Sequence, residues 1–162
     1  RGKGMSYRAQ CNLHLHYAQK HLGLLENNED DWGGNLLPAV GGSSLFHLIL
    51  SYRFHLRDVV NKHSPSENTF EHAASAQAFL QSRQHISPEL TELEYKEQTA
   101  WLGDMLNYPF MDAAQQSSSG GLAMDVLAAD SPKNTLSYSF IKQCCQGLDE
   151  LVKRQREGMQ EW

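Results

Sequence analysis

Eight histidines are the residues of this sequence best suited to chemistry, because imidazole binds metal ions and transfers protons near neutral pH. Two side chains of one helix reach the same metal ion when they are three or four positions apart. No two histidines have this spacing, and no Glu-x-x-His pair occurs. Cys11 precedes His14 by three residues and His55 precedes Asp58 by three, so each pair needs a further ligand, for which His47 is the clearest candidate. Two-residue matches arise freely by chance, so we expect no metal site.

Arginine–histidine pairs indicate a second chemistry, the cleavage of RNA. An arginine can hold a phosphate while a histidine one or two turns later on the same helix acts as general acid or base. Arg57 with His63 fits this pattern, and so does Arg8 with His14. The net charge of −5 opposes an RNA substrate, because an acidic domain repels phosphate backbones. A helical RNase is therefore a weak alternative, and we expect no nucleic-acid partner.

A pocket between helices is another alternative, in which polar side chains would bind a small ligand or a metal ion. The candidate residues for it are His14, His47, His55, Arg53 and Arg57. The sequence has no Gly-rich phosphate loop and no nucleophile motif, so it predicts no catalytic residue and no cofactor. Our leading interpretation is a non-enzymatic protein-interaction or regulatory module that binds a protein partner or a second copy of itself.

The spacing of apolar residues predicts the elements that carry these side chains. Apolar residues recur every three or four positions, which is the pattern of amphipathic helices, and no stretch alternates as a strand would. The predicted helices cover about 6–27, 43–62 (capped by Ser43 or Ser44 after the loop glycines Gly41-Gly42), 66–83, two pieces between 88 and 106, and 134–158. The helix over 43–62 has apolar residues on two flanks and is expected at the centre. The fold class is therefore all-α, an up-and-down bundle of four to five main helices.

The chain length of 162 residues suits one domain. Residues 1–4 precede a methionine and look like a vector-derived remnant, which leaves 5–162 as a single domain with a flexible Gly/Ser loop near 113–122. Three cysteines, two of them adjacent, make a poor disulfide framework, and Cys144-Cys145 falls on an apolar stripe. No signal peptide or membrane-spanning run is visible, so we expect a cytoplasmic protein without a membrane partner.

Several short stretches resemble a known family. The residues are Asn12, His16-Tyr17-Ala18, Ser44-Leu45-Phe46-His47-Leu48, Thr99-Ala100-Trp101-Leu102 and Arg156-Glu157-Gly158. Together they are similar to a family of short bacterial proteins classed as a domain of unknown function. The likeness covers most of the chain after Met5, and the sequence differs from the family at Tyr52-Arg53-Phe54-His55, where smaller apolar residues are usual. The resemblance implies a helical, bacterial, cytoplasmic protein and assigns no site residue.

Overall fold

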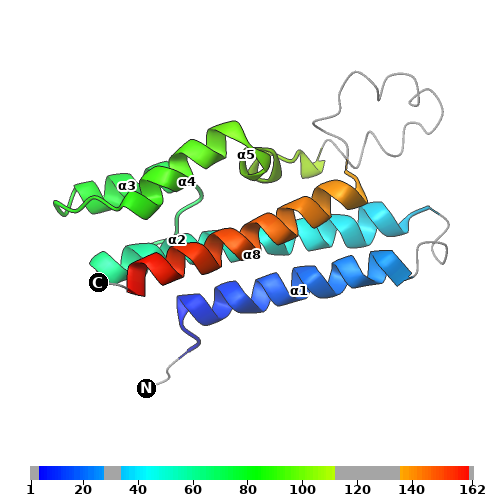
Figure 1. Cartoon of the computed structure of the whole chain (residues 1–162), viewed down its shortest axis with the longest axis horizontal. Coiled ribbons are helices and arrows are strands. Elements are labelled where there is room, and N and C mark those ends of the chain that lie inside the picture. The colour runs from blue at the N-terminus through cyan, green and yellow to red at the C-terminus, as the bar shows by residue number, and fades with distance from the viewer. Residues whose placement is uncertain (1–3, 28–33, 112–135, 161–162) are drawn as a thin grey trace.

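A computed structural model describes residues 4–27, 34–111 and 136–160, and every regular element in these ranges is helical. The elements are α1 (Tyr7–Asn27), a π-helical turn (Leu37–Gly41), α2 (Gly42–His63), α3 (Ala73–Gln81), α4 (Pro88–Thr99), α5 (Trp101–Leu106) and α8 (Tyr138–Gln160). The predicted all-α bundle is confirmed (Figure 1). The predicted Gly/Ser loop near 113–122 lies outside the described residues. Among the described helices, none combines the length and apolar character that crossing a membrane requires.

Three long helices, α1, α2 and α8, pack against one another, and the α3–α4 hairpin with α5 lies over α2 and α8 on the side away from α1 (Figure 1). Helix α1 runs antiparallel to both α2 and α8, while α2 and α8 run in the same direction. One contact shows this parallel arrangement: His55 of α2 is hydrogen bonded to Gln155 of α8. Another is Gly41, immediately before α2, which lies against Ile141 near the start of α8.

Small residues spaced seven apart bring α1 and α2 close together. Cys11 and Ala18 of α1 face Ser51 and Ser44 of α2, and all four side chains are fully buried. Each serine hydroxyl donates a hydrogen bond across the contact, from Ser51 to the Cys11 carbonyl and from Ser44 to the Ala18 carbonyl, both at 2.8 Å. A serine in a helix can satisfy its hydroxyl on a neighbouring backbone only when the two helices approach closely. We call this contact the seam.

The main core lies on the inner side of the seam, between α2, α8 and the hairpin. The α2 residues that fill it have no exposed surface and are Leu45, Leu48, Tyr52, Leu56 and Val59. Helix α8 contributes its predicted stripe, including Cys144, Cys145 and Leu148. Both cysteines are therefore buried, as the sequence predicted, and burial raises the pKa of the Cys144 thiol to about 12 and that of Cys145 to about 11.

Helix α3 begins at Ala73, seven residues later than the start predicted at Ser66. Backbone groups of the intervening segment bond to side chains instead of to each other: the Ser66 carbonyl accepts from Tyr7, and the Glu67 carbonyl accepts from Arg57. These bonds compete with helix formation. The actual start of α3 is capped from α4, because the Glu97 carboxylate accepts hydrogen bonds from the Ala73 amide at 2.8 Å and from the buried Tyr52 hydroxyl at 2.5 Å.

Gly41 and Gly42, where the π-helical turn meets α2, do not form the predicted loop. Gly41 and Gly42 both have right-handed helical backbone angles, so the π-helical turn runs directly into α2, and neither Ser43 nor Ser44 is an N-cap. A side chain at Gly41 would place its Cβ 2.9 Å from the Ile141 methyl group. Gly41 therefore lies at a close approach of α8 and not in a turn.

The break predicted between Pro88 and Leu106 is confirmed, since α4 ends at Thr99 and α5 begins at Trp101. Ala100 between them is extended. The bend brings Gly103 so close to the Glu97 carbonyl that an added Cβ would lie 2.2 Å from its oxygen. Helix α8 begins at Tyr138, and the two residues before it, Leu136 and Ser137, are not helical. The start predicted at about 134 was therefore too early.

Candidate functional site

A row of ring side chains follows the outer side of the seam, away from α8. It alternates between the two helices in the order Phe54, His14, His47 and His21, with neighbouring ring centroids 5.6, 5.2 and 5.5 Å apart. The ring planes of each neighbouring pair differ by 24° or less. His14 and His21 are seven residues apart on α1, as are His47 and Phe54 on α2, so the row repeats with the same period as the seam. We call this surface the ring face.

His14 and His47 meet directly through their Nδ1 atoms, which are 3.0 Å apart. The two ring centroids are 5.2 Å apart, which is longer than the distance between the Nδ1 atoms by about twice the radius of an imidazole ring. Each Nδ1 therefore points at the other ring, and the two rings lie edge to edge. One imidazole must donate its Nδ1 proton and the other must accept it, which requires opposite tautomers of the neutral rings. Burial lowers the pKa of His14. The pKa of His47 is lowered by burial first and then by its histidine neighbours, His14 and His21.

Arg57 extends the ring face toward the start of α1. Its guanidinium lies 4.2 Å from the Tyr7 ring centroid and 5.8 Å from that of Phe54. It also donates hydrogen bonds to the Tyr7 hydroxyl at 3.1 Å and to the Glu67 carbonyl at 3.0 Å. Through these contacts Arg57 of α2 joins α1 to the segment before α3.

Three aromatic side chains along the ring face are substantially exposed. Phe46 is 50% exposed, Tyr17 40% and Phe110 36%. They are connected, because both Tyr17 and Phe46 lie edge-on to His47, at 5.2 and 6.1 Å, and Phe46 also meets Phe110 at 6.4 Å. The result is a continuous aromatic surface on α1, α2 and the residues after α5.

The five residues predicted to line one pocket are divided between different places. His14, His47 and Arg57 lie on the ring face. His55 points to the inner side, where it has no exposed surface, contacts Gln155 at 2.8 Å, and has its pKa lowered by burial. Arg53 is bonded to the Glu71 carbonyl at 3.4 Å. The structure therefore brings together three of the five.

Sequence reasoning missed His21, Tyr17 and Phe54 as members of the same surface. His14 and His21 are seven residues apart, which is about two helical turns and places both on one side of α1. Metal ligands on one helix are expected three or four residues apart, so this longer spacing did not indicate a shared surface. Among the described residues, no group of three or more His, Cys, Asp or Glu side chains is arranged to hold a metal ion.

The arginine–histidine pairs predicted for RNA cleavage have separate partners. Arg57 is held by Tyr7, as described above, whereas the His63 ring lies 6.0 Å from that of His85. Arg8 pairs with Asp58 at 3.5 Å. Neither arginine contacts the histidine that the pattern associates with it.

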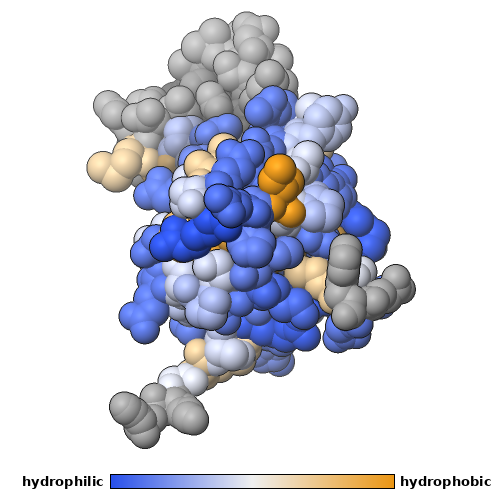
Figure 2. All heavy atoms as spheres, turned by 90° about the vertical axis from the view of Figure 1, so that its left-hand side faces the viewer, coloured by the Kyte–Doolittle hydropathy of each residue, from blue (hydrophilic) through white to orange (hydrophobic). Residues whose placement is uncertain are grey.

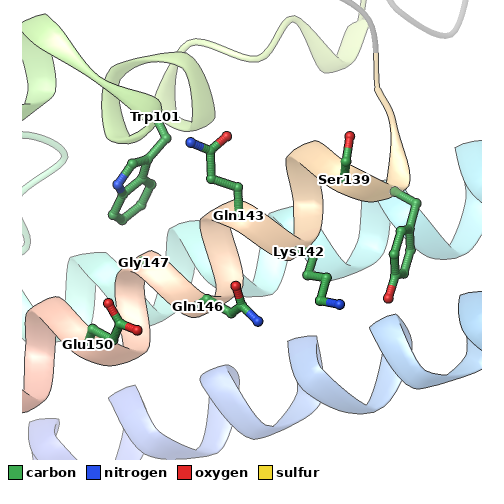
Figure 3. A pocket seen from close by; sticks show the side chains of 8 residues that line it. Trp101, Ser139, Lys142, Gln143, Gln146, Gly147 and Glu150 are labelled. Carbon is green, nitrogen blue, oxygen red and sulfur yellow. The ribbon is translucent and has the colours of Figure 1, made fainter.

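A groove of about 550 Å³ lies between α5 and the first half of α8 (Figure 3). Trp101 forms one wall, and the floor is the polar side of α8, from Ser139 through Gln143 and Gln146 to Glu150. The indole sits directly on Gly147, where an added Cβ would lie 2.6 Å from two ring carbons. Trp101 lies within one of the helical pieces predicted between 88 and 106, and its contact with Gly147 was not predictable because the two residues are distant in the sequence.

The end of the bundle where α2 and α8 finish has no comparable surface. Figure 2 shows this end, at the left of Figure 1, and hydrophilic side chains dominate it. The α3–α4 turn at this end carries Ile86, which is 69% exposed. Hydrophobic side chains are scattered here and do not gather into a patch.

Comparison with known proteins gives a family for the chain. Residues 5–162 match the model of a family of unknown function, DUF6586. No curated protein and no solved structure matches the chain. The match covers nearly the whole sequence and agrees with the resemblance seen in its short stretches. The chain therefore belongs to the DUF6586 family.

Proposed function

We propose that this protein is a non-enzymatic interaction module of the bacterial cytoplasm that self-associates through its ring face. The observation that carries the proposal is the continuous exposure of Tyr17, Phe46 and Phe110. Large aromatic side chains dominate the energetics of protein interfaces, and contiguous apolar patches on a monomer mark interaction sites. Exposing half of the Phe46 side chain to water has no benefit for the fold itself.

The chemistry of the ring face favours a second copy as the partner. The centre of the ring face is uncharged at neutral pH, because Phe46 and Phe110 are apolar and the pKa of His47 is lowered. The guanidinium of Arg57, at the end of the face, is bonded to the Tyr7 hydroxyl and the Glu67 carbonyl. The whole chain has a net charge of −5, so two copies repel each other wherever acidic surfaces meet. An uncharged face avoids this repulsion. A two-fold dimer needs a self-complementary patch, and neutral rings that stack or meet edge to edge provide one.

The extent of the ring face is sufficient for such a contact. Helix α1 has 21 residues, which corresponds to a length of about 31 Å. With α2 beside it, the pair presents a width of about 20 Å, hence an area on the order of 600 Å². A standard interface buries about 800 Å² of accessible surface per partner, which a rugged face of this size approaches.

Sedimentation velocity over a concentration series tests the proposal, with Phe46→Ser as the disrupting variant. We expect the parent protein to dimerise as concentration rises and Phe46→Ser to remain monomeric. Ile86→Ser is the matched control, since Ile86 is more exposed than Phe46 but belongs to no patch. A parent protein that stays monomeric up to millimolar concentration would refute self-association, as would equal dimerisation of parent and Phe46→Ser.

The alternative of an interhelical ligand site has less support. His55 and Arg53, two of its five residues, point elsewhere and are bonded to Gln155 and to the Glu71 carbonyl. The remaining histidine pair bonds to itself. Interaction with another macromolecule is therefore the function that these contacts favour.

A further inference from the structure

We infer that the His14–His47 pair makes self-association through the ring face depend on pH, so that protonation of the pair separates the two copies. This inference rests on the self-association proposed above and adds its regulation. The pair occupies the middle of the row, because the Phe54 ring lies beyond His14 and the His21 ring lies beyond His47. A charge on the pair is therefore placed at the centre of the proposed interface.

The bond between the two histidines accepts one further proton but not two. In the neutral pair one ring donates its Nδ1 proton to the other across 3.0 Å, so the Nε2 atom of the donating ring is unprotonated and binds the next proton. The bond survives this first step, and the pair then carries one positive charge. The second step breaks the bond, since two N–H groups of about 1 Å each would point at one another across the same gap.

The described groups around the pair supply no negative charge to balance a proton. The charged or titratable side chains along the row are Tyr17 and His21 from α1, Arg57 from α2, and Tyr108 after α5, whose ring lies 4.8 Å from that of Phe110. Among the described residues, no carboxylate is hydrogen bonded or ion paired to His14, His47 or His21. A proton on the pair is therefore not neutralised from within its own copy.

Protonation begins below neutral pH. Burial lowers the pKa of His14, and burial followed by the two neighbouring histidines lowers that of His47. Both rings are therefore neutral in most molecules at pH 7.5, where the face is suited to a second copy. Acidification charges the pair while the aromatic side chains beside it, Phe46 and Phe110, stay unchanged.

Two-fold symmetry doubles the effect of one proton. Both copies of a two-fold dimer use the same patch, so the charged pair of one copy approaches the charged pair of the other. Like charges repel more strongly where an interface excludes water. The dimer therefore binds fewer protons than two separate copies, and its Kd rises as the pH falls. If each copy must release one proton, the rise reaches about a hundredfold per pH unit below the pKa of the pair, tenfold for each copy.

The net charge of the chain predicts a change of the opposite sign. The chain carries a net charge of −5 at pH 7, and its isoelectric point is about 5.9. Acidification to pH 5.5 therefore removes the general repulsion between copies and strengthens any association that depends on net charge alone. A dimer that weakens over this range does so against the trend of the whole molecule, which assigns the effect to a local group.

Sedimentation velocity at pH 7.5, 6.5 and 5.5 and constant ionic strength tests the inference, with circular dichroism to verify folding at each pH. We expect the Kd of the parent dimer to rise at least about tenfold from pH 7.5 to pH 5.5. The double variant His14→Asn/His47→Asn keeps polar atoms near the Nδ1 positions but does not titrate, so its Kd should stay constant or fall. His16→Asn/His85→Asn is the matched control, since it removes two exposed histidines outside the row and should keep the parent's pH dependence.

Proton release provides a second measurement that needs no variant. Calorimetric dilution of the parent dimer at pH 6.0, in two buffers with different ionisation enthalpies, counts the protons exchanged on dissociation. We expect dissociation to take up protons at pH 6.0 and almost none at pH 7.5, because separate copies bind more protons than the dimer only where the pair titrates.

Three results would overturn the inference. One is a Kd for the folded parent that is equal or lower at pH 5.5 than at pH 7.5. Another is dissociation at pH 6.0 without proton uptake. The third is a double asparagine variant that dimerises with the parent's pH dependence. A parent protein that is monomeric at pH 7.5 removes the proposed self-association and this inference with it, whereas a dimer that persists unchanged at pH 5.5 removes only the inference.

Discussion

The contact between Trp101 and Gly147 leads to a prediction with an unusual sign. Replacing glycine by alanine inside a helix normally stabilises a protein by about 0.5–1 kcal/mol. At Gly147 the new Cβ would lie 2.6 Å from two indole carbons, whereas ordinary carbon contacts lie at about 3.5–4.0 Å. The indole must therefore retreat by about 1 Å, and overpacking of this kind costs about 1–3 kcal/mol. We expect Gly147→Ala to destabilise the fold by about 1 kcal/mol.

Chemical denaturation followed by circular dichroism measures this free energy of unfolding, and α8 contains a matched control. A Cβ at Gly158 meets nothing within 4 Å, so Gly158→Ala should leave stability unchanged or increase it. Removing the ring by Trp101→Ala should also reverse the sign of the effect at Gly147, because the two positions are coupled. If Gly147→Ala stabilises the protein as much as Gly158→Ala does, the indole does not rest on Gly147, and the wall of the groove is not fixed as described.

Three further predictions concern the buried polar and titratable groups. Glu97→Ala should lower the free energy of unfolding by about 2–4 kcal/mol in urea titrations, because it leaves the Tyr52 hydroxyl and the Ala73 amide without their acceptor, while the neighbouring Glu94→Ala should have little effect. The melting temperature should fall when the pH is lowered from 7.5 to 5.5. Folding lowers the pKa of His14, His47 and His55 below the ordinary 6.5, so the unfolded chain binds more protons than the folded one and stability decreases as the pH falls. An unchanged melting temperature over this range would contradict this reasoning. Finally, all three cysteines should resist Ellman's reagent at pH 8 until the protein is denatured, because burial raises the pKa of each thiol, and rapid labelling of the native protein would show that a cysteine is accessible.

Helix formation was predictable because apolar spacing depends only on local periodicity. The stripe from Leu45 to Val60 identified α2 as the central helix, and the break near Ala100 followed from a loss of the pattern. The start of α3 was not predictable in the same way. The helix was predicted to start at Ser66, but side chains that are distant in the sequence, Tyr7 and Arg57, bond to the backbone carbonyls of this segment, which is not helical.

The candidate site was predicted only in part, for a similar reason. His14 and His47 could be selected by residue type, yet their direct contact depends on how α1 and α2 are aligned. The buried serines at this contact look in the sequence like ordinary polar residues, Ser44 near the start of the predicted helix and Ser51 in its middle. Gly41 likewise indicated a turn, because sequence alone does not reveal that Ile141 needs the space.

The seam has a consequence for how this fold can tolerate change. Ser44 and Ser51 bond across the seam to backbone carbonyls, which every amino acid carries, so these two bonds do not require a particular side chain at the accepting residue. Outer-side residues that make no contact between the two helices, such as Phe46, can then be exchanged without disturbing these two bonds. Family members that keep the two serines and the small residues opposite them can carry quite different outer surfaces on one unchanged frame, and each can acquire its own specificity by surface substitution alone.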